Sequence, residues 1–265
     1  MSDPIASPAN SRIKALIRLR ERRQRDATRT FIVEGYRELL RFADAGLAMR
    51  TLFICPELFV GVNESALVDR CRDSGAEIVE VGAVPFRKAS YRDRPEGLLA
   101  VADQFDTGLD RIPLTGTPLV LVAESIEKPG NLGTMLRTAE AAGLSGVIVT
   151  DPTTDPYNPN VVRASLGTMF AVPIAIADTP SAIAHLRAVG LRIVATTPDA
   201  TLPHYQADLR GPTALVIGSE QYGLSKLWLD AADTGVVIPM PGSVDSLNAA
   251  MAAGIIMFEA VRQRS

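Results

Sequence analysis

The sequence predicts an α/β protein in which parallel β/α units dominate. The first observation is an alternation of strand-like and helix-like segments along most of the 265 residues, which is typical of such units. The second is the continuous apolar run Leu119–Ala123, which suits a strand covered on both faces. The third is an apolar content of 47%, ample for a large buried core.

An N-terminal domain is expected over residues 1–106. Its expected strands are 31–33, 51–55, 77–81 and 97–102. Its expected helices are 10–25, 34–45, 65–74 and 85–90. The strand over 97–102 is expected at the outer edge of its sheet. Residues 107–118 are rich in Gly and Pro and have little periodicity, which predicts a linker.

A larger C-terminal domain is expected over residues 119–265. Its expected strands are 119–123, 146–150, 169–176, 191–196, 213–217 and 235–238. Its expected helices are 131–142, 161–167, 180–189, 225–231 and 246–262. Because strands and helices alternate throughout, we expect a parallel sheet with helices packed on its faces.

Composition and short motifs exclude several classes of protein. Cys55 and Cys71 are too few for a disulfide framework or a structural zinc site, and with only two histidines we expect no metal centre. No apolar stretch reaches membrane-spanning length, and residues 1–8 lack an apolar signal region, so we expect a cytoplasmic protein without a membrane partner. No Gly-x-Gly-x-x-Gly follows a strand, which argues against a dinucleotide-binding site.

The segment Asn10–Arg25 is strongly basic and carries apolar residues at roughly helical spacing. Its basic residues are Arg12, Lys14, Arg18, Arg20, Arg22, Arg23 and Arg25. This pattern predicts an amphipathic helix whose basic face contacts phosphate groups, although a solvated helix face with one apolar stripe explains the same charges. The rest of the chain is correspondingly more acidic, which favours the phosphate-binding interpretation.

The first of three chemical motifs is Lys128–Thr138. A Pro-Gly loop follows a strand there, and Asn131 is a residue type that caps helix N-termini well. Capping does not explain Arg137, which lies six residues further on in an otherwise apolar helix. On the inner face of such a helix the guanidinium needs a partner, which is either a phosphate or a carboxylate.

The second motif is Gly218–Leu224, a loop that follows an apolar strand. Gly218 and Gly223 suit a strand end or a turn, but neither role accounts for Glu220 between them. Loops at strand ends expose backbone N–H and C=O groups, and ligands of open α/β sheets bind at such loops. The Gly-x-Glu-x-x-Gly spacing alone has low specificity.

The third motif, Ile238–Asn248, is the most specific of the three. It leads into a helix whose first N–H groups are unpaired and can bind an anion. Ser246 either serves such a ligand or simply caps the helix. The first turns of this helix contain small residues that permit very close backbone packing, namely Ala249, Ala250, Ala252, Ala253 and Gly254.

Together these motifs resemble those of the SpoU/TrmH family of SPOUT proteins, knotted RNA ribose 2′-O-methyltransferases that use S-adenosylmethionine. The resemblance implies a SPOUT-type parallel sheet with a deep trefoil knot in residues 119–265. It also implies a small L30e-like α/β domain that binds the RNA substrate in residues 1–106, and a homodimer formed through the C-terminal helix. The layout is similar to that of 23S rRNA methyltransferases, including the thiostrepton-resistance type.

The resemblance assigns roles to individual residues. Arg137 is either the general base or a ligand of an RNA phosphate while solvent takes the proton. The residues implied to position the ribose, the phosphate and Arg137 are Asn131, Glu220, Ser246 and Asn248. The residues implied to bind S-adenosylmethionine are Thr196, Gly218, Ile238 and Leu247. The residues implied to bind RNA are Arg18, Arg22, Arg25 and Arg163.

The expected function is methylation of a ribose 2′-hydroxyl in structured RNA, with rRNA favoured over tRNA as the partner. One alternative is a non-catalytic RNA-binding protein built on a methyltransferase fold, which the three intact motifs oppose. Another is an enzyme that acts on a small metabolite. That alternative fits the net charge of −3 but leaves the basic segment Asn10–Arg25 unexplained.

Overall fold

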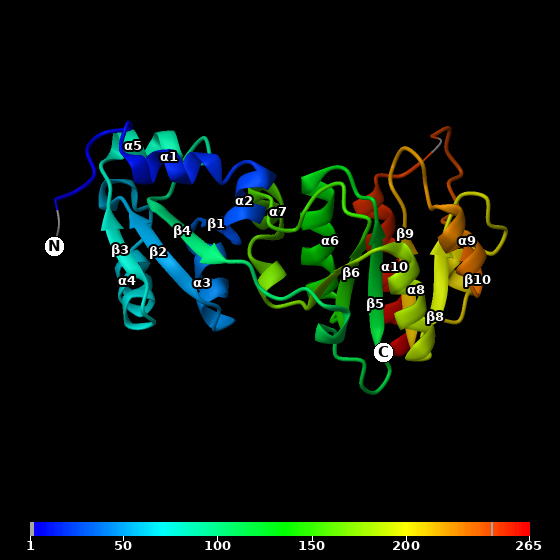
Figure 1. Cartoon of the computed structure of the whole chain (residues 1–265). Helices are drawn as coiled ribbons and strands as arrows, with labels where there is room; N and C mark the ends of the chain where they lie inside the picture. Colours follow the sequence, from blue (N-terminus) through cyan, green and yellow to red (C-terminus); the bar gives the residue numbers. More distant parts are fainter. Residues whose placement is uncertain (1–2, 245) are drawn as a thin grey trace. The chain divides into compact units, whose positions relative to one another are not determined.

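The computed structural model describes residues 3–244 and 246–265, and the chain forms two compact units (Figure 1). The first unit comprises the chain up to Phe105 together with Pro156–Phe170, and the second comprises Asp106–Asp155 and Ala171–Ser265. We expected two domains, but not that a later segment of the chain would belong to the first of them.

Aromatic packing explains why Pro156–Phe170 belongs to the first unit. The rings of Phe31 and Tyr157 lie with their centroids 5.1 Å apart, and those of Phe42 and Phe170 lie 5.0 Å apart in an edge-to-face arrangement. Such pairs are favourable beyond the apolar area that they bury. Two rings from the later segment therefore complete a core that the N-terminal residues begin.

The first unit contains a four-stranded sheet in the order β1-β4-β2-β3. Its strands are β1 (Thr30–Glu34), β2 (Met49–Ile54), β3 (Glu77–Glu80) and β4 (Leu98–Asp103). Strand β4 is antiparallel to both β1 and β2, so the prediction that it lies at the sheet edge is wrong. Its first residues form a buried apolar run, which suits a strand flanked on both sides.

Helices cover this sheet. They are α1 (Ser11–Arg18), α2 (Arg22–Thr28), α3 (Tyr36–Asp44), α4 (Glu64–Asp73), α5 (Ala83–Ala89) and α7 (Pro159–Ser165). The single helix predicted over 10–25 is therefore two helices, with a break between Arg18 and Arg22. Ile13 and Leu16 of α1 are buried in the core, as the apolar spacing predicted.

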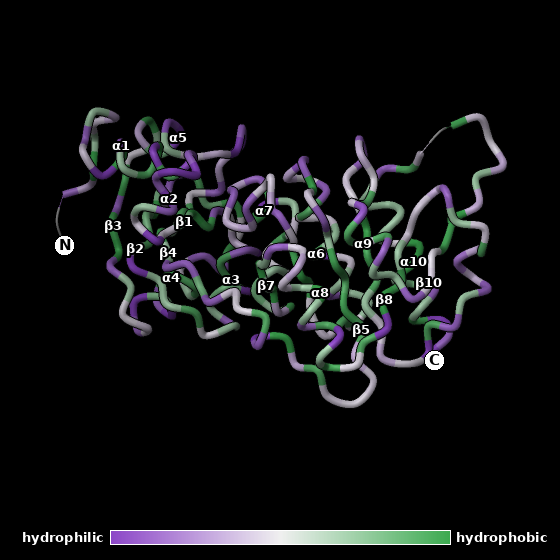
Figure 2. The backbone as a smooth tube through the Cα atoms, turned by 45° about the vertical axis from the view of Figure 1, so that its right-hand side comes forward, coloured by the Kyte–Doolittle hydropathy of each residue, from purple (hydrophilic) through white to green (hydrophobic). Residues whose placement is uncertain are grey.

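The second unit contains a six-stranded sheet in the order β10-β8-β9-β5-β6-β7, in which every pair is parallel. Its strands are β5 (Leu119–Glu124), β6 (Gly146–Thr150), β7 (Ile174–Ala177), β8 (Arg192–Thr196), β9 (Thr213–Ile217) and β10 (Thr234–Val236). The predicted parallel sheet is confirmed. Strand β5 is buried throughout and is coloured as hydrophobic along most of its length in Figure 2.

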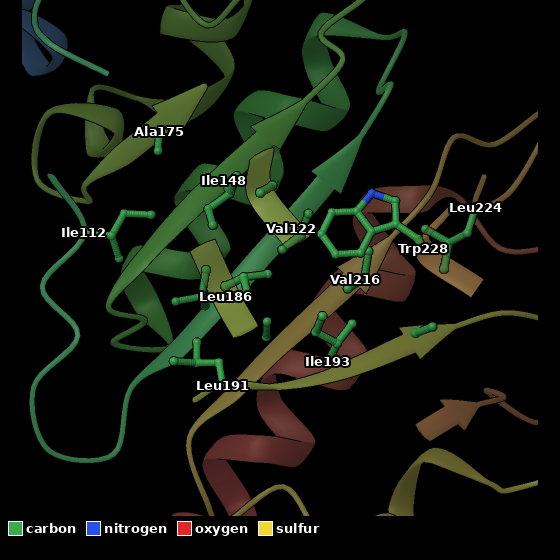
Figure 3. Close-up of a cluster of buried hydrophobic side chains, with 14 residues drawn as sticks. Ile112, Val122, Ile148, Ala175, Leu186, Leu191, Ile193, Val216, Leu224 and Trp228 are labelled. Carbon is green, nitrogen blue, oxygen red and sulfur yellow. The ribbon is translucent and has the colours of Figure 1, made fainter. Parts of the chain in front are cut away.

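Helices pack on both faces of this sheet. They are α6 (Pro129–Ala141), α8 (Thr179–Ala188), α9 (Lys226–Ala231) and α10 (Ala249–Arg264). Figure 3 shows the core on one face, where the fully buried Trp228 of α9 packs with Leu186 of α8 and with strand residues. The Trp228 indole N–H donates to the Thr179 hydroxyl at 3.1 Å. Helix α10 passes behind the strands and packs against α6.

The segment 107–118 is not the predicted linker but part of the second unit. Ile112 is buried in its core (Figure 3), and the backbone N–H of Ile176 donates to the carbonyl of Thr107 at 2.8 Å. Gly and Pro shape turns here, while a single apolar residue anchors the segment.

Several predicted elements differ in their bounds, and one feature stays a prediction. The strand expected over 169–176 is shortened to β7 because the 3-10 turn η3 (Thr168–Phe170) occupies its first residues. The last helix begins at Ala249 and not at Ser246. The trefoil knot remains implied by the resemblance.

In the described part of the chain, no helix is long and apolar enough to cross a membrane.

Candidate functional site

A pocket of about 360 Å³ lies at the carboxyl ends of β8, β9 and β10. Ligands of open parallel sheets bind at this edge, since the loops that follow the strands leave backbone groups exposed there. All four residues predicted to bind the cofactor line this one pocket: Thr196, Gly218, Ile238 and Leu247. The structure therefore brings together residues that span about fifty positions of the sequence.

The loop after β9 closes upon itself. The Ser219 N–H donates to the Gly223 carbonyl at 3.2 Å, and the Gly223 N–H donates to the Ser219 carbonyl at 3.1 Å. Gly223 has φ of +67°, a conformation that glycine adopts without strain. A Cβ atom on Gly218 would lie 2.2 Å from the Gly223 carbonyl oxygen. Glycine at 218 is thus required by the loop itself, in addition to any close approach of a ligand.

A Gly218→Ala substitution is expected to weaken S-adenosylmethionine binding at least tenfold, which is about 1.4 kcal/mol. The added methyl group collides with backbone atoms, so the loop that lines the pocket must move. Calorimetric titration measures the affinity. Gly211→Ala is the matched control, because a Cβ there meets no atom within 4 Å. Wild-type affinity in a folded Gly218→Ala protein would place the cofactor elsewhere.

The carboxylate of Glu220 connects all three motifs. Its Oε1 accepts from Asn131 Nδ2 at 2.8 Å, from Asn248 Nδ2 at 2.6 Å and from the Ala249 N–H at 3.3 Å. Its Oε2 pairs with Lys128 Nζ. The Asn248 amide also donates to Asn131 Oδ1 at 3.0 Å. Residues that the sequence placed in three separate motifs therefore form one hydrogen-bonded cluster.

This cluster keeps Glu220 ionised. The hydrogen bond from Lys128 lowers the pKa of the Glu220 carboxyl, and the Ala249 N–H and the Asn131 amide act in the same direction against the effect of partial burial. A carboxylate with a lowered pKa is a weak proton acceptor at neutral pH. Glu220 is therefore suited to holding loops in place and not to general-base catalysis.

Asn248 caps helix α10. Its Oδ1 accepts from the N–H groups of Ala250 and Met251 at 3.0 and 3.2 Å. Ser246, which we considered as the cap, is exposed and lies before the helix, where it lines the pocket. Because Asn248 uses its oxygen for the helix and its amide for Glu220, it joins α10 to the loop after β9.

The helix of the first motif also differs from the prediction. Helix α6 begins at Pro129 after Lys128, so Asn131 is not its cap but reaches Glu220 from the first turn. Arg137 is exposed, not on an inner face, and has no partner among the residues that the structure describes. Its guanidinium is thus available to a ligand from outside the chain.

Sequence reasoning missed Lys128 as a member of the site. Its side chain is 67% exposed, yet it pairs with Glu220, whose side chain is only 21% exposed. Pocket residues such as Thr197, Asp199 and Met240 were missed as well. A signal for Lys128 existed, because a cation at the start of the first motif complements the carboxylate of the second. The other three carry no such signal and are placed by the fold.

The residues predicted to bind RNA do not share one environment. Arg18 and Arg163 are exposed, and Arg22 is exposed with its Nε 3.6 Å from Asp26 Oδ2. Arg25 is only 1% exposed, and its Nη1 donates to the carbonyls of Leu19 and Arg20 at 2.9 and 2.8 Å. The prediction that Arg25 contacts RNA is therefore wrong, because its guanidinium satisfies the carbonyls at the break between α1 and α2.

Charge is unevenly divided between the two units. The first unit carries 18 Lys and Arg against 15 Asp and Glu, and the second carries 9 against 15. The net charge of −3 therefore combines +3 in the first unit with −6 in the second. No group of three or more metal-ligating side chains occurs among the described residues. The positive unit is the one suited to a polyanion.

The chain is similar to known proteins along most of its length. Residues 118–258 match the SpoU rRNA Methylase family, and residues 10–100 match the MRM3-like substrate binding domain. The chain is 36% identical over 197 residues to the 23S rRNA (guanosine-2′-O-)-methyltransferase RlmB of Ralstonia nicotianae, covering 72% of this chain and 79% of that protein. It is 33% identical over 255 residues to the 23S rRNA (uridine(2479)-2′-O)-methyltransferase of Streptomyces viridochromogenes, covering 93% and 87%.

Solved structures agree with these sequence matches. The AdoMet-bound rRNA methyltransferase from Sinorhizobium meliloti matches with a TM-score of 0.90 at 33% identity, over 98% of this chain and 97% of that one. The SpoU methyltransferase AviRb from Streptomyces viridochromogenes, in complex with AdoMet, matches with a TM-score of 0.88 at 31% identity, over 96% and 98%. The resemblance inferred from the three motifs is confirmed, and the chain belongs to the SpoU rRNA methylase family.

Proposed function

We propose that this chain transfers a methyl group from S-adenosylmethionine to a ribose 2′-hydroxyl of 23S rRNA. The observation that carries the proposal is the convergence of Asn131, Glu220 and Asn248 at one edge of a pocket lined by the loops after β8, β9 and β10. The names of the relatives support rRNA as the substrate.

The pocket fits S-adenosylmethionine. Its volume lies in the range of about 300–1,000 Å³ that small-molecule sites occupy. The Oγ1 atom of Thr196 is buried there without a hydrogen-bond partner among the described residues, so the site offers an unused donor and acceptor. When bound, the cofactor supplies a methyl group on an electrophilic sulfonium.

The chain's own residues then have to orient the ribose. Since the Glu220 cluster holds the first turn of α6, the loop after β9 and the start of α10 together, it fixes the wall against which the ribose lies. Such fixed alignment of reacting atoms is itself a large part of catalysis. We place Arg137 as a ligand of the RNA phosphate, because an exposed guanidinium binds phosphate through two parallel hydrogen bonds. Solvent takes the hydroxyl proton in this scheme.

Transfer of radiolabel from S-adenosylmethionine tests the proposal. We expect wild-type protein to label 23S rRNA transcribed in vitro and to leave total tRNA unlabelled. Labelling of tRNA alone would favour the tRNA alternative. Cofactor binding without labelling of either RNA would favour a non-catalytic RNA-binding protein.

The exposed basic residues of α1 and α2 are proposed to bind RNA phosphates. Lys14, Arg18 and Arg23 are exposed and have no partner among the described residues. Changing all three to Gln should flatten the slope of log affinity against log salt by roughly 2 to 3, since each phosphate contact contributes about 0.7 to 0.9. Filter binding over a range of salt concentrations measures this slope.

A matched triple variant controls for the lost charge. Arg50, Arg70 and Arg72 are exposed in the same unit but pair with Asp103, Asp44 and Asp69. Their change to Gln removes the same charge and should leave most of the slope unchanged. Equal effects of the two triple variants would mean that only the total charge of the unit matters.

A homodimer is proposed through α10. One face of this helix is buried, but Met251 is 61% exposed and Phe258 is 49% exposed, and their spacing of seven residues puts them together on a different face. Apolar residues so placed suit a self-complementary interface. Light scattering should give twice 28.3 kDa at micromolar concentration, and Phe258→Glu should give the single-chain mass. A wild-type mass of one chain would contradict the dimer.

A further inference from the structure

The first unit contains a second pocket, of about 430 Å³, that is separate from the cofactor pocket. The first turn of α3 contributes Tyr36, Arg37 and Glu38, and the loop before α4 contributes Asn63. Its volume also lies in the range of about 300–1,000 Å³ typical of small-molecule sites. Nothing in the three motifs accounts for it.

A buried charge network forms the inner wall. Arg92 donates through Nη2 to Glu38 Oε1 and through Nη1 to Glu96 Oε1, both at 2.6 Å. The same Nη2 donates to the Glu34 carbonyl at 3.0 Å. Glu38 is 2% exposed and Arg92 is 17% exposed, so the network is fixed in place. Glu96 Oε2 also accepts from the Tyr36 N–H at 3.2 Å, but a carboxylate can accept about four hydrogen bonds and the Glu96 side chain is 33% exposed, so it retains acceptor capacity that a ligand can reach.

The rim of this pocket is suited to a flat ligand. Tyr36 is half-buried on the pocket wall, and Arg37 is exposed without a partner among the described residues. Val60 lines the same opening and is 78% exposed. Aromatic rings and guanidinium planes are the groups on which unpaired RNA bases stack. An apolar side chain at the mouth adds contact area without any demand for hydrogen bonds.

We propose that this pocket receives an unstacked base of the substrate RNA, and guanine above the other bases. The inference rests on the proposed function. Carboxylates repel phosphate, so Glu96 is unsuited to the RNA backbone, whereas its partly exposed carboxylate accepts hydrogen bonds from base N–H groups. Guanine offers two neighbouring donors on its Watson–Crick edge, N1–H and the 2-amino group. Tyr36 stacks on the base and Arg37 binds the phosphate beside it.

A basic segment of a protein partner is the main competing occupant, because it would also satisfy the carboxylates. The surroundings oppose it. The first unit has a net charge of +3, and Arg37 at the rim repels a cationic peptide. A nucleotide combines a donor-rich base with an anionic phosphate and so matches both parts of the pocket.

Filter binding of the full-length chain to 23S rRNA transcribed in vitro tests the proposal. Tyr36→Ala should weaken binding about tenfold and leave the slope of log affinity against log salt unchanged, because no phosphate contact is lost. Asn63→Ala should also weaken binding, because Asn63 lines the same pocket. Tyr36→Phe should restore wild-type affinity, since the ring is retained. Tyr205→Ala is the control, because this tyrosine is exposed and lies in the other unit.

Ultraviolet cross-linking followed by mass spectrometry gives a second, direct readout. We expect an RNA adduct on the peptide that contains Tyr36, with guanosine at the attached nucleotide. Wild-type RNA affinity of both Tyr36→Ala and Asn63→Ala would overturn the inference, as would the absence of any adduct on that peptide. An adduct to a different base would refute the preference for guanine.

Steady-state methyl transfer to 23S rRNA separates this inference from the proposed function. If wild-type protein fails to transfer methyl groups to RNA, the proposed function fails whatever the pocket binds. If wild-type protein methylates 23S rRNA and Tyr36→Ala does so with the same KM for RNA, only the pocket assignment fails. If the assignment is right, Tyr36→Ala raises that KM about tenfold and leaves kcat and the affinity for S-adenosylmethionine unchanged.

Discussion

Replacing Arg137 by Ala is expected to reduce methyl transfer at least about 100-fold, while the affinity for S-adenosylmethionine stays within twofold of wild type. The rate falls because a reacting group displaced by about 1 Å can lose about two orders of magnitude in rate. Cofactor affinity is retained because Arg137 does not line the cofactor pocket. Single-turnover transfer of radiolabel to 23S rRNA, together with calorimetric titration of the cofactor, measures both quantities.

Arg210→Ala provides the matched control for this variant. Arg210 is also an exposed arginine of the second unit, but it pairs with Asp208 and lies outside the cofactor pocket. The Arg210→Ala protein should methylate 23S rRNA at the wild-type rate. Near-normal turnover by Arg137→Ala would remove this residue from the mechanism. Arg137→Lys separates charge from geometry, because lysine keeps the positive charge but cannot form the paired hydrogen bonds of a guanidinium.

Glu220→Gln is expected to lower kcat/KM by about 10- to 100-fold without changing the size of the side chain. The carboxylate accepts four hydrogen bonds, and an amide in its place brings a donor against Lys128, Asn131 or Asn248. The affected hydrogen bonds join the three motifs, so the elements that form the site are expected to shift relative to one another. Steady-state methyl transfer measures the loss. Lys226→Gln, which breaks an exposed pair with Asp230, is the control and should have no effect.

Glu220 also predicts a pH dependence of stability. Its folded-state pKa is lowered below the ordinary value of 4.5, chiefly by the hydrogen bond from Lys128. The carboxylate therefore contributes stability above pH about 4.5, and this contribution is lost as the pH falls through the lower folded-state pKa. Thermal unfolding between pH 7 and 3 should show a smaller acid-induced loss for Glu220→Gln than for wild type. Identical pH profiles would mean that the cluster adds nothing to folding.

Much of the fold was accessible from the sequence because local patterns agreed with the final structure. The buried run Leu119–Ala123 became a central strand of the parallel sheet, and the loops after β8, β9 and β10 became part of the cofactor pocket. Glu220 was identified because the turn roles of the neighbouring glycines do not account for it, and Gly218 and Asn248 were identified through the family resemblance. The structure adds that they contact one another or line one pocket.

The errors share a physical cause, which is tertiary packing that local patterns do not encode. In the sequence, Arg25 cannot be told from the exposed basic residues around it. In the structure, its guanidinium donates hydrogen bonds to two carbonyls at the break between α1 and α2. Strand β4 follows an alternation of strands and helices that is typical of parallel sheets. It nevertheless lies between β1 and β2 and is antiparallel to both. The segment 107–118 has the composition of a linker, although Ile112 anchors it in a core.

The second pocket could not be predicted for the same reason. Tyr36, Asn63 and Arg92 are far apart in the sequence, and none belongs to a recognisable motif. Only the sheet order β1-β4-β2-β3 brings the start of α3, the loop before α4 and the residues before β4 to one place. A site assembled from the start of one helix and from two loops leaves no periodic or spaced signal in one sequence.

Mapping of ribose 2′-O-methylation in cellular RNA, with and without the gene, tests the central claim most directly. We predict that one ribose in 23S rRNA loses its methyl group when the gene is deleted. The modification should return with the wild-type gene but not with the gene for Arg137→Ala. Unchanged methylation throughout rRNA, or a loss confined to tRNA, would contradict the assignment of this chain as a 23S rRNA ribose methyltransferase.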